Sequence, residues 1–438
     1  MLKTLRQALK IDDIRRKILY TFLMLIVIRF GSQLPTPGAD PTYIQDFFAS
    51  QTGDAFNFFN AFTGGSFTSM SVFALSITPY ITSSIIMQLL TIAIPKLEEM
   101  QKEGEEGRKK ITAITRYVTV ALALIESGAM AISFGRQGLL VEYNFVNGAI
   151  VVLTLTAGSA FLMWIGERIT ENGVGNGISV VLLINILSRI PQDFTTLFEQ
   201  FVQGKGLAKG GLAAIVILLI VLVVVVFVII LQGGERRIAV QYSQKIQGRK
   251  TVGGQSTHIP LKVNTSGVIP IIFASSLMQF PIVIASFAGK GDGTGIGSEI
   301  LHGLNSQNWC NPENIKYSWG LLVYILLTIF FAYFYTSITF NPLEIANNMK
   351  KNGGFIPGIR PGKPTVEYLT KILNNIIFIG ACGLVIVQVI PFFFNGVFSA
   401  NVSFGGTSLI IIVGVVLDTI KQIESQMLVR NYKGFLNS

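Results

Sequence analysis

Long apolar segments alternate with polar connections along the whole chain. Ten apolar segments can be counted, and about 20 residues are enough for a helix to cross a bilayer. They cover residues 18–34, 70–94, 111–134, 145–165, 177–190, 212–231, 268–288, 319–340, 371–394 and 404–420. The fifth and tenth are short or rich in glycine, so we expect them inside the bundle, away from lipid. The pattern predicts an all-α polytopic membrane protein with ten transmembrane helices.

The number of segments bears on symmetry. Ten spans divide into five plus five, and because five is odd, two similar halves would cross the membrane in opposite directions. Two inverted five-helix halves around a central pore are therefore compatible with the count. Similarity between the two halves of the sequence is too weak to establish this repeat from the residues alone.

Lysine and arginine gather in alternate connections. The connections rich in these residues are 1–17, 95–110, 232–263 and 341–371, whereas 31–69 and 391–403 contain neither residue. Basic connections stay on the cytoplasmic side of a membrane. This rule predicts that both chain termini are cytoplasmic.

The N-terminus begins with a basic stretch, MLKTLRQALKIDDIRRK, before the first apolar segment. A cleavable signal peptide would have small residues after its apolar core. Arg29 and the Pro-Thr-Pro of residues 35–37 stand there instead. We interpret residues 1–17 as a cytoplasmic interfacial helix that precedes an uncleaved first span.

Composition agrees with the membrane class. Half of the 438 residues are hydrophobic and 13% are charged, and the mean hydropathy is +0.56. A soluble chain carries about a quarter charged residues. Two cysteines, Cys310 and Cys382, are too few for a disulfide scaffold.

Motifs of several catalytic classes are absent from the sequence. It contains no HExxH metal motif, no GxxxxGK[ST] phosphate loop and no GxSxG nucleophile motif. We therefore expect no enzymatic activity, no bound metal and no cofactor. Any energy for transport would come from a partner or from a gradient.

Two segments are unusually polar for membrane spans. The second contains Ser71, Ser76, Thr78, Thr82, Ser83, Ser84, Gln88 and Thr91, and the seventh contains Ser275, Ser276 and Gln279. Pro270 and Pro281 can also bend the seventh. Polar groups at this depth face a water-filled cavity or a partner helix, which suggests a seam that opens. Tight packing of small residues is the alternative.

Two aliphatic pairs have helical spacing. Ile77 and Ile81 are four residues apart, as are Ile178 and Leu182, so each pair shares one helix face. Spacing alone favours ordinary core or lipid-facing residues. Only their position in the fold can show whether these residues have a role beyond packing.

Three connections could have roles beyond linking spans. Residues 54–70 are rich in phenylalanine and too polar to span, so they either lie at the interface or fold back into an external cavity. The connections 232–263 and 341–371 are long and basic. They either fix topology or bind an acidic partner such as a protein surface, anionic lipid or RNA phosphate.

Eight sequence stretches together resemble the SecY family of Sec translocation channels, in the family's order and spacing. They are FNAFTGGSF, FALSITPYITSSIIMQLL, EGEEGRKK, ERITENGVGNGIS, GGERRIAVQY, QSTHIPLKVNTSGVIPIIFASS, FNPLEIANNMKKNGGFIPGIRPGKPT and FGGTSLIIIV. The resemblance covers essentially the whole chain. It implies a channel of two halves, residues 18–190 and 212–420, followed by a cytoplasmic tail, 421–438.

The resemblance also assigns roles to residues. It implies a pore ring of Ile77, Ile81, Ile178, Leu182, Ile272 and Ile411, with Leu182 standing where isoleucine is commoner. A plug at about 56–69 would include Phe58, Phe59, Phe62, Gly64 and Gly65. Spans two, three, seven and eight would form a lateral gate, with Thr82, Gln88, Glu126, Asn264, Ser276 and Phe280. Partners would dock on Arg236, Arg237, Arg249, Lys250, Lys350, Lys351 and Arg360.

The implied function is translocation of unfolded polypeptides across the bacterial plasma membrane and lateral release of signal and transmembrane segments into lipid. Implied partners are the SecE and SecG subunits, the SecA motor ATPase, the ribosome, secretory and membrane-protein substrates, and anionic lipids. A secondary transporter with five-plus-five repeats is the main rival. It would need coordinating groups near the midplane, where charges such as Arg29, Glu126 and Asp418 are sparse.

Overall fold

The computed structural model describes residues 6–39, 44, 63–136, 138, 144–203, 207–242, 245–247, 250–252, 256–287, 296–310, 312, 315–398 and 406–436. Helices dominate. The N-terminal half contains α2 (Asp12–Gly31), α5 (Thr78–Ala93), α6 (Pro95–Lys102), α7 (Glu105–Arg136), α8 (Phe145–Asn172) and α9 (Gly177–Phe201). The C-terminal half contains α10 (Leu207–Gly233), α11 (Ile269–Phe287), α12 (Ile296–Leu304), α13 (Trp319–Thr339), α14 (Pro342–Lys351), α15 (Lys363–Phe398) and α16 (Gly406–Leu436).

Among the described residues, six helices are long and apolar enough to cross a membrane, in the regions of α7, α8, α9, α10, α13 and α15. A seventh span results if α5 and α6 count as one span, bent by 101°. Every predicted apolar segment overlaps a helix, and the remaining three overlap α2, α11 and α16. The helical, polytopic architecture is confirmed, and the count of ten spans stays a prediction.

Three boundaries differ from those expected. Residues 6–8 are helical, and α2 then begins at Asp12, inside the expected interfacial stretch 1–17, because acidic residues suit a first turn and Asp12 pairs with Arg15 at 2.8 Å. α5 begins at Thr78 rather than at 70. It ends at Ala93 because Pro95 forces the preceding residue, Ile94, into an extended conformation.

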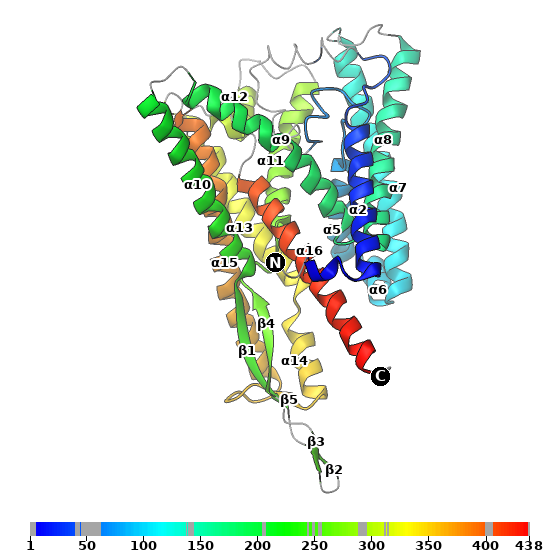
Figure 1. Ribbon diagram of the computed structural model, residues 1–438, viewed down its shortest axis with the longest axis vertical. Helices are drawn as coiled ribbons and strands as arrows, with labels where there is room; N and C mark the ends of the chain where they lie inside the picture. Colours follow the sequence, from blue (N-terminus) through cyan, green and yellow to red (C-terminus); the bar gives the residue numbers. More distant parts are fainter. Residues whose placement is uncertain are drawn as a thin grey trace.

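The two halves lie side by side (Figure 1). α2, α7 and α8 lie on the right of the view, whereas α10, α13 and α15 lie on the left. α9 packs against α8 in its own half and against α16 of the other half, and α16 packs in turn on α10 and α15. The contact between α9 and α16 therefore joins the halves.

A small sheet adds to the predicted helical fold. β1 (Glu235–Tyr242) pairs antiparallel with β4 (Ser256–Lys262), and β5 (Gly354–Phe355) pairs with the end of β1. β2 (Lys245–Gln247) and β3 (Lys250–Val252) form a separate two-stranded ribbon. Short 3₁₀ turns at Ser306–Asn308 and Ile315–Ser318 precede α13.

The sheet unites the two long basic connections. We call β1, β4, β5, α14 and residues 356–362 the β subdomain, which lies at one end of the molecule (Figure 1). Its apolar core includes Ile238 and Val240 of β1, Met349 of α14 and Leu369 of α15. Each connection thus supplies part of a shared core, which topology signals alone would not need.

Candidate functional site

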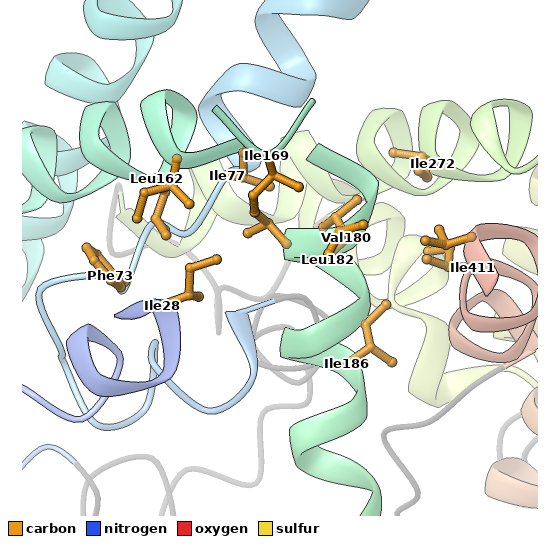
Figure 2. Close-up of a cluster of buried hydrophobic side chains, with 13 residues drawn as sticks. Ile28, Phe73, Ile77, Leu162, Ile169, Val180, Leu182, Ile186, Ile272 and Ile411 are labelled. Carbon is orange, nitrogen blue, oxygen red and sulfur yellow. The ribbon is translucent and has the colours of Figure 1, made fainter. Parts of the chain in front are cut away.

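The six residues of the predicted pore ring belong to one apolar cluster. Ile77, Leu182, Ile272 and Ile411 are at most 9% exposed, and Ile81 and Ile178 pack against the same cluster. They come from the start of α5, from α9, from α11 and from α16. Figure 2 shows Leu182 on α9, with Ile77 on one side of it and Ile411 on the other.

This cluster joins the two halves of the fold. Most other apolar clusters of the described residues belong to one half, such as that of Met70, Met130 and Leu155 or that of Val228, Ile271 and Leu384. The ring cluster contains Ile77 and Leu182 together with Ile272 and Ile411. Aliphatic side chains offer water no hydrogen bonds, so an assembly of them can exclude water and ions.

The segment before Ile77 is buried but not helical. Residues 64–77 form turns, apart from an isolated β-bridge between Ser71 and Pro35, and Met70 and Ser76 have φ angles of 45° and 51°. Irregular backbone at membrane depth is tolerated only where protein surrounds it. Met70, Ser71, Ala74 and Ser76 are all almost fully buried. The first residue of the ring therefore sits at the end of an irregular segment.

Hydrogen bonds hold this segment to its surroundings. The Thr36 N–H donates to Met70 O and the Val72 N–H donates to Leu34 O, both at 2.9 Å. α8 approaches so closely that a Cβ at Gly158 would clash with the Val72 carbonyl. Asn185 of α9 donates from Nδ2 to Ser76 Oγ at 2.9 Å. Sequence reasoning missed Asn185, although it continues the helical spacing of Ile178 and Leu182.

Of the predicted plug, Phe58, Phe59 and Phe62 lie outside the described residues. Gly64 and Gly65 have φ angles of 66° and 89°, which glycine adopts without strain. A Cβ at Gly64 would stand 2.7 Å from the Asn185 carbonyl oxygen. Gly64, within the predicted plug segment 56–69, thus lies directly against α9.

The helices of the predicted lateral gate pair within their own halves. α5 packs on α7, and α11 packs on α13, while α11 touches α7 slightly and makes at most slight contact with α5. Ser83 of α5 donates to the Thr115 carbonyl of α7 at 2.8 Å. Ser275 of α11 bonds the Tyr324 hydroxyl of α13 at 3.1 Å. Ser83 and Ser275 therefore each bond a neighbouring helix of their own half.

The other predicted gate residues have varied settings. Thr82 is half-buried and donates to its own helix at Thr78 O, and Ser276 and Glu126 are also half-buried. Gln88 is exposed. Asn264 is buried and donates to Gly267 O at 3.0 Å, so its bond is local to the turn before α11. Phe280 belongs to α11, and its side chain lies outside the described part of the structure.

Five predicted docking residues line the β subdomain. Arg236, Arg237, Lys350, Lys351 and Arg360 are exposed. Within the described residues, Arg237 reaches Glu235 at 4.0 Å, and the other four form no ion pair. Arg249 lies outside the described residues, as does the side chain of Lys250 in β3.

The turn around Arg360 is well defined. Gly358 and Gly362 have φ angles of 80° and 111°, and Pro361 stands between Arg360 and Gly362. The Thr365 hydroxyl donates to the Arg360 carbonyl at 2.9 Å. Ile359 packs into the core of the β subdomain. These contacts anchor the turn while the Arg360 side chain remains exposed.

Two ion pairs that the sequence did not reveal link the β subdomain to α16. Glu235 and Lys262 are partners across β1 and β4. Lys262 Nζ lies 3.5 Å from Asp418 Oδ1, and Lys421 Nζ lies 3.6 Å from Glu235 Oε1. α16 also carries Ile411. The helix that forms ion pairs with the β subdomain therefore also contributes a residue to the pore ring.

Comparison with known proteins gives a consistent result. The SecY family model matches residues 71–420. Protein translocase subunit SecY of Corynebacterium glutamicum is 42% identical, over 98% of this chain and 99% of its own. The subunits of Mycobacterium tuberculosis and Streptomyces coelicolor are 40% and 43% identical, with each alignment covering both chains completely.

Solved structures support the same fold. A protein-conducting channel has a TM-score of 0.64 at 17% identity, covering 94% of this chain and 93% of its own. Sec61 of the canine ribosome-channel complex has a TM-score of 0.60 at 16% identity, with coverage of 94% and 93%. The identities to the bacterial relatives, maintained over nearly the full length of both chains, establish that this chain belongs to the SecY family.

Proposed function

We propose that this chain is a protein-conducting channel, which passes unfolded polypeptides across the membrane and releases apolar segments sideways into lipid. The observation that carries this proposal is the aliphatic ring at the junction of the two halves. Such a ring seals by excluding water, and it can surround a passing chain of any sequence because it contains no specific hydrogen-bonding groups. Membership of the SecY family supports this function.

Crosslinking during transit tests the channel directly. A signal-bearing precursor arrested partway should form crosslinks to a photoreactive residue placed at Ile411 or Leu182. The same probe at Leu187, an exposed residue of α9, serves as the matched control and should not react with the precursor. A precursor that reaches the other side without ever contacting the ring positions would refute the pore assignment.

A small-solute transporter is the rival function. It would need ion- or substrate-coordinating groups at the centre of the fold, whereas the residues gathered there are aliphatic. A proton-coupled uptake assay on the purified protein separates the two possibilities. Uptake of a small solute without partner proteins would favour the transporter.

The lateral gate would open between α5 with α7 on one side and α11 with α13 on the other. Each pair is packed together firmly, and little contact crosses between the pairs. Polar contacts between helices in membranes average only about 0.6 kcal/mol. A signal helix contributes about 0.3–0.6 kcal/mol for each Leu, Ile, Phe or Val that it places at the membrane centre. Several such residues can therefore outweigh the contacts that close the gate.

Locking the gate should block secretion. Cysteines at Thr82 and Phe280, introduced after replacement of Cys310 and Cys382, should form a disulfide in the resting protein. We expect at least a tenfold loss of precursor translocation, about 1.4 kcal/mol, and recovery on reduction. Each single-cysteine variant is a control for the substitution itself. Normal secretion by the oxidised double variant would show that these helices do not form the gate.

The β subdomain would be the docking face for partners. Its exposed and mostly unpaired basic residues suit an acidic protein surface or RNA phosphate. We propose the SecA motor and the ribosome as partners there, SecE and SecG as subunits of the same complex, and contact with anionic lipids. The canine Sec61 structure, which is part of a ribosome-channel complex, supports the ribosome proposal. The proposed location is the bacterial plasma membrane, with both termini cytoplasmic.

A further inference from the structure

Asn185 is a polar residue on the apolar face of α9 that carries the ring. It follows Leu182 by three residues and Ile178 by seven, so all three lie on one stripe of the helix. Asn185 is 2% exposed. An amide in such a position is retained in a stable fold only when it has a hydrogen-bonding partner.

Its partner is the residue that immediately precedes the ring. Asn185 Nδ2 donates to Ser76 Oγ at 2.9 Å, and Ser76 is itself 1% exposed. Ser76 has a φ angle of 51°, which serine rarely adopts. Ile77, the first ring residue, follows directly. The bond to Asn185 therefore holds the strained residue that determines where Ile77 enters the ring.

Asn185 also contacts Gly64 through its backbone. A Cβ at Gly64 would lie 2.7 Å from Asn185 O and 2.8 Å from Ser188 Oγ. The Ser188 hydroxyl donates to Asn185 O at 2.7 Å and lies 3.4 Å from Gly64 O. One turn of α9 thus contacts both ends of the irregular segment 64–76.

No helix leads into Ile77 from its N-terminal side, because residues 72–77 form turns. We infer that Asn185 is a positioning residue that holds Ile77 against Leu182 and so determines how tightly the ring closes. This role rests on the proposed channel function. Asn185 then sets how much binding free energy a signal segment must supply to open the channel. A looser ring is opened by a weaker signal, since less binding free energy is required.

The test uses the full-length protein with its partner subunits and motor in proteoliposomes. The probes are a signal-bearing precursor and the same precursor with one arginine inserted in the apolar core of its signal. Asn185→Leu keeps a similar volume and removes the amide, and Ser76→Ala removes the acceptor. We expect each to raise resting ion flux and to raise transport of the defective precursor, relative to the intact one, by about tenfold.

Two comparisons separate this role from general destabilisation. The double variant should be no more permissive than either single variant, because both remove the same bond. Thr156→Val is the matched control, since it removes another buried hydrogen bond of this half, the 3.0 Å contact with Ser127. It should leave ion flux and discrimination as in the wild type.

Several results would overturn the inference. Wild-type discrimination in Asn185→Leu, additive effects in the double variant, or equal relaxation by Thr156→Val would each do so. If Asn185→Leu fails to fold, Ser76→Ala decides the matter alone, because it deletes one oxygen atom. Wild-type protein that does not transport the intact precursor would refute the channel function itself, which is a distinguishable failure.

Discussion

Replacing Arg360 by glutamate should abolish motor-driven translocation while the protein still folds and inserts. Arg360 is exposed on a turn that Gly358, Pro361 and Gly362 define, and the Thr365 hydroxyl holds its carbonyl. Its side chain pairs with no acidic group among the described residues, so it is available to an acidic partner. Reversing a charge at a docking contact costs about 2 kcal/mol or more, which corresponds to docking at least about thirtyfold weaker.

The measurement compares SecA ATPase stimulation and precursor translocation in the same vesicles. Lys371→Glu is the matched control, because it reverses an equal charge in the same basic connection but on α15, away from the turn. If the charge at Arg360 only fixed topology, the two variants would behave alike. Equal behaviour, or normal ATPase stimulation by Arg360→Glu, would contradict the docking role.

The apolar pattern predicted the helices well because lipid imposes a simple requirement. Any backbone in lipid must satisfy its hydrogen bonds internally, so long apolar segments become helices. The same pattern failed between 70 and 77. There, protein surrounds the chain, so that irregular backbone is permitted, and hydropathy does not distinguish a buried turn from a helix. Pro79 in the first turn of α5 was the local signal for the later start.

The β subdomain was not predicted because the two long basic connections were interpreted from their charge alone. In β1, the buried Ile238 and Val240 alternate with exposed residues, which is the period of a half-buried strand. The pairing of β1 with β5 joins residues more than a hundred positions apart. Such a pairing, and the core that it completes with Met349 and Leu369, depends on the tertiary arrangement of both connections.

The pore ring illustrates what spacing can and cannot provide. Spacing placed Ile77 with Ile81 and Ile178 with Leu182, but it gave no reason to join these pairs to Ile272 or Ile411. Family resemblance supplied the set, and the fold brings all six into one cluster. The sequence did not identify Asn185 as a site residue, because a lone amide in an apolar helix has no distinctive pattern. Its role depends on Ser76, which is distant in sequence.

Replacing Ile411 by asparagine should let water into the ring and make the resting channel leak ions. Ile411 is 1% exposed and packs in the cluster that joins the two halves. An amide buried without a partner costs about 1–3 kcal/mol, and water entering the ring relieves that cost. The free energy of the dry, closed ring therefore rises relative to that of hydrated states. We expect resting ion flux to rise by about tenfold or more. Precursors with defective signals should also pass.

Substitutions within the aliphatic class distinguish polarity from packing. Leu182→Ile keeps the ring apolar, so it should leave ion flux and signal discrimination unchanged even though it alters side-chain shape at the same constriction. Ile272→Asn, from the other half, should reproduce the leak of Ile411→Asn because both amides enter one cluster. Ion flux under an applied potential, measured in proteoliposomes without precursor, gives the result. A leak in Leu182→Ile as large as that in Ile411→Asn would mean that packing, and not the exclusion of water by aliphatic side chains, maintains the seal.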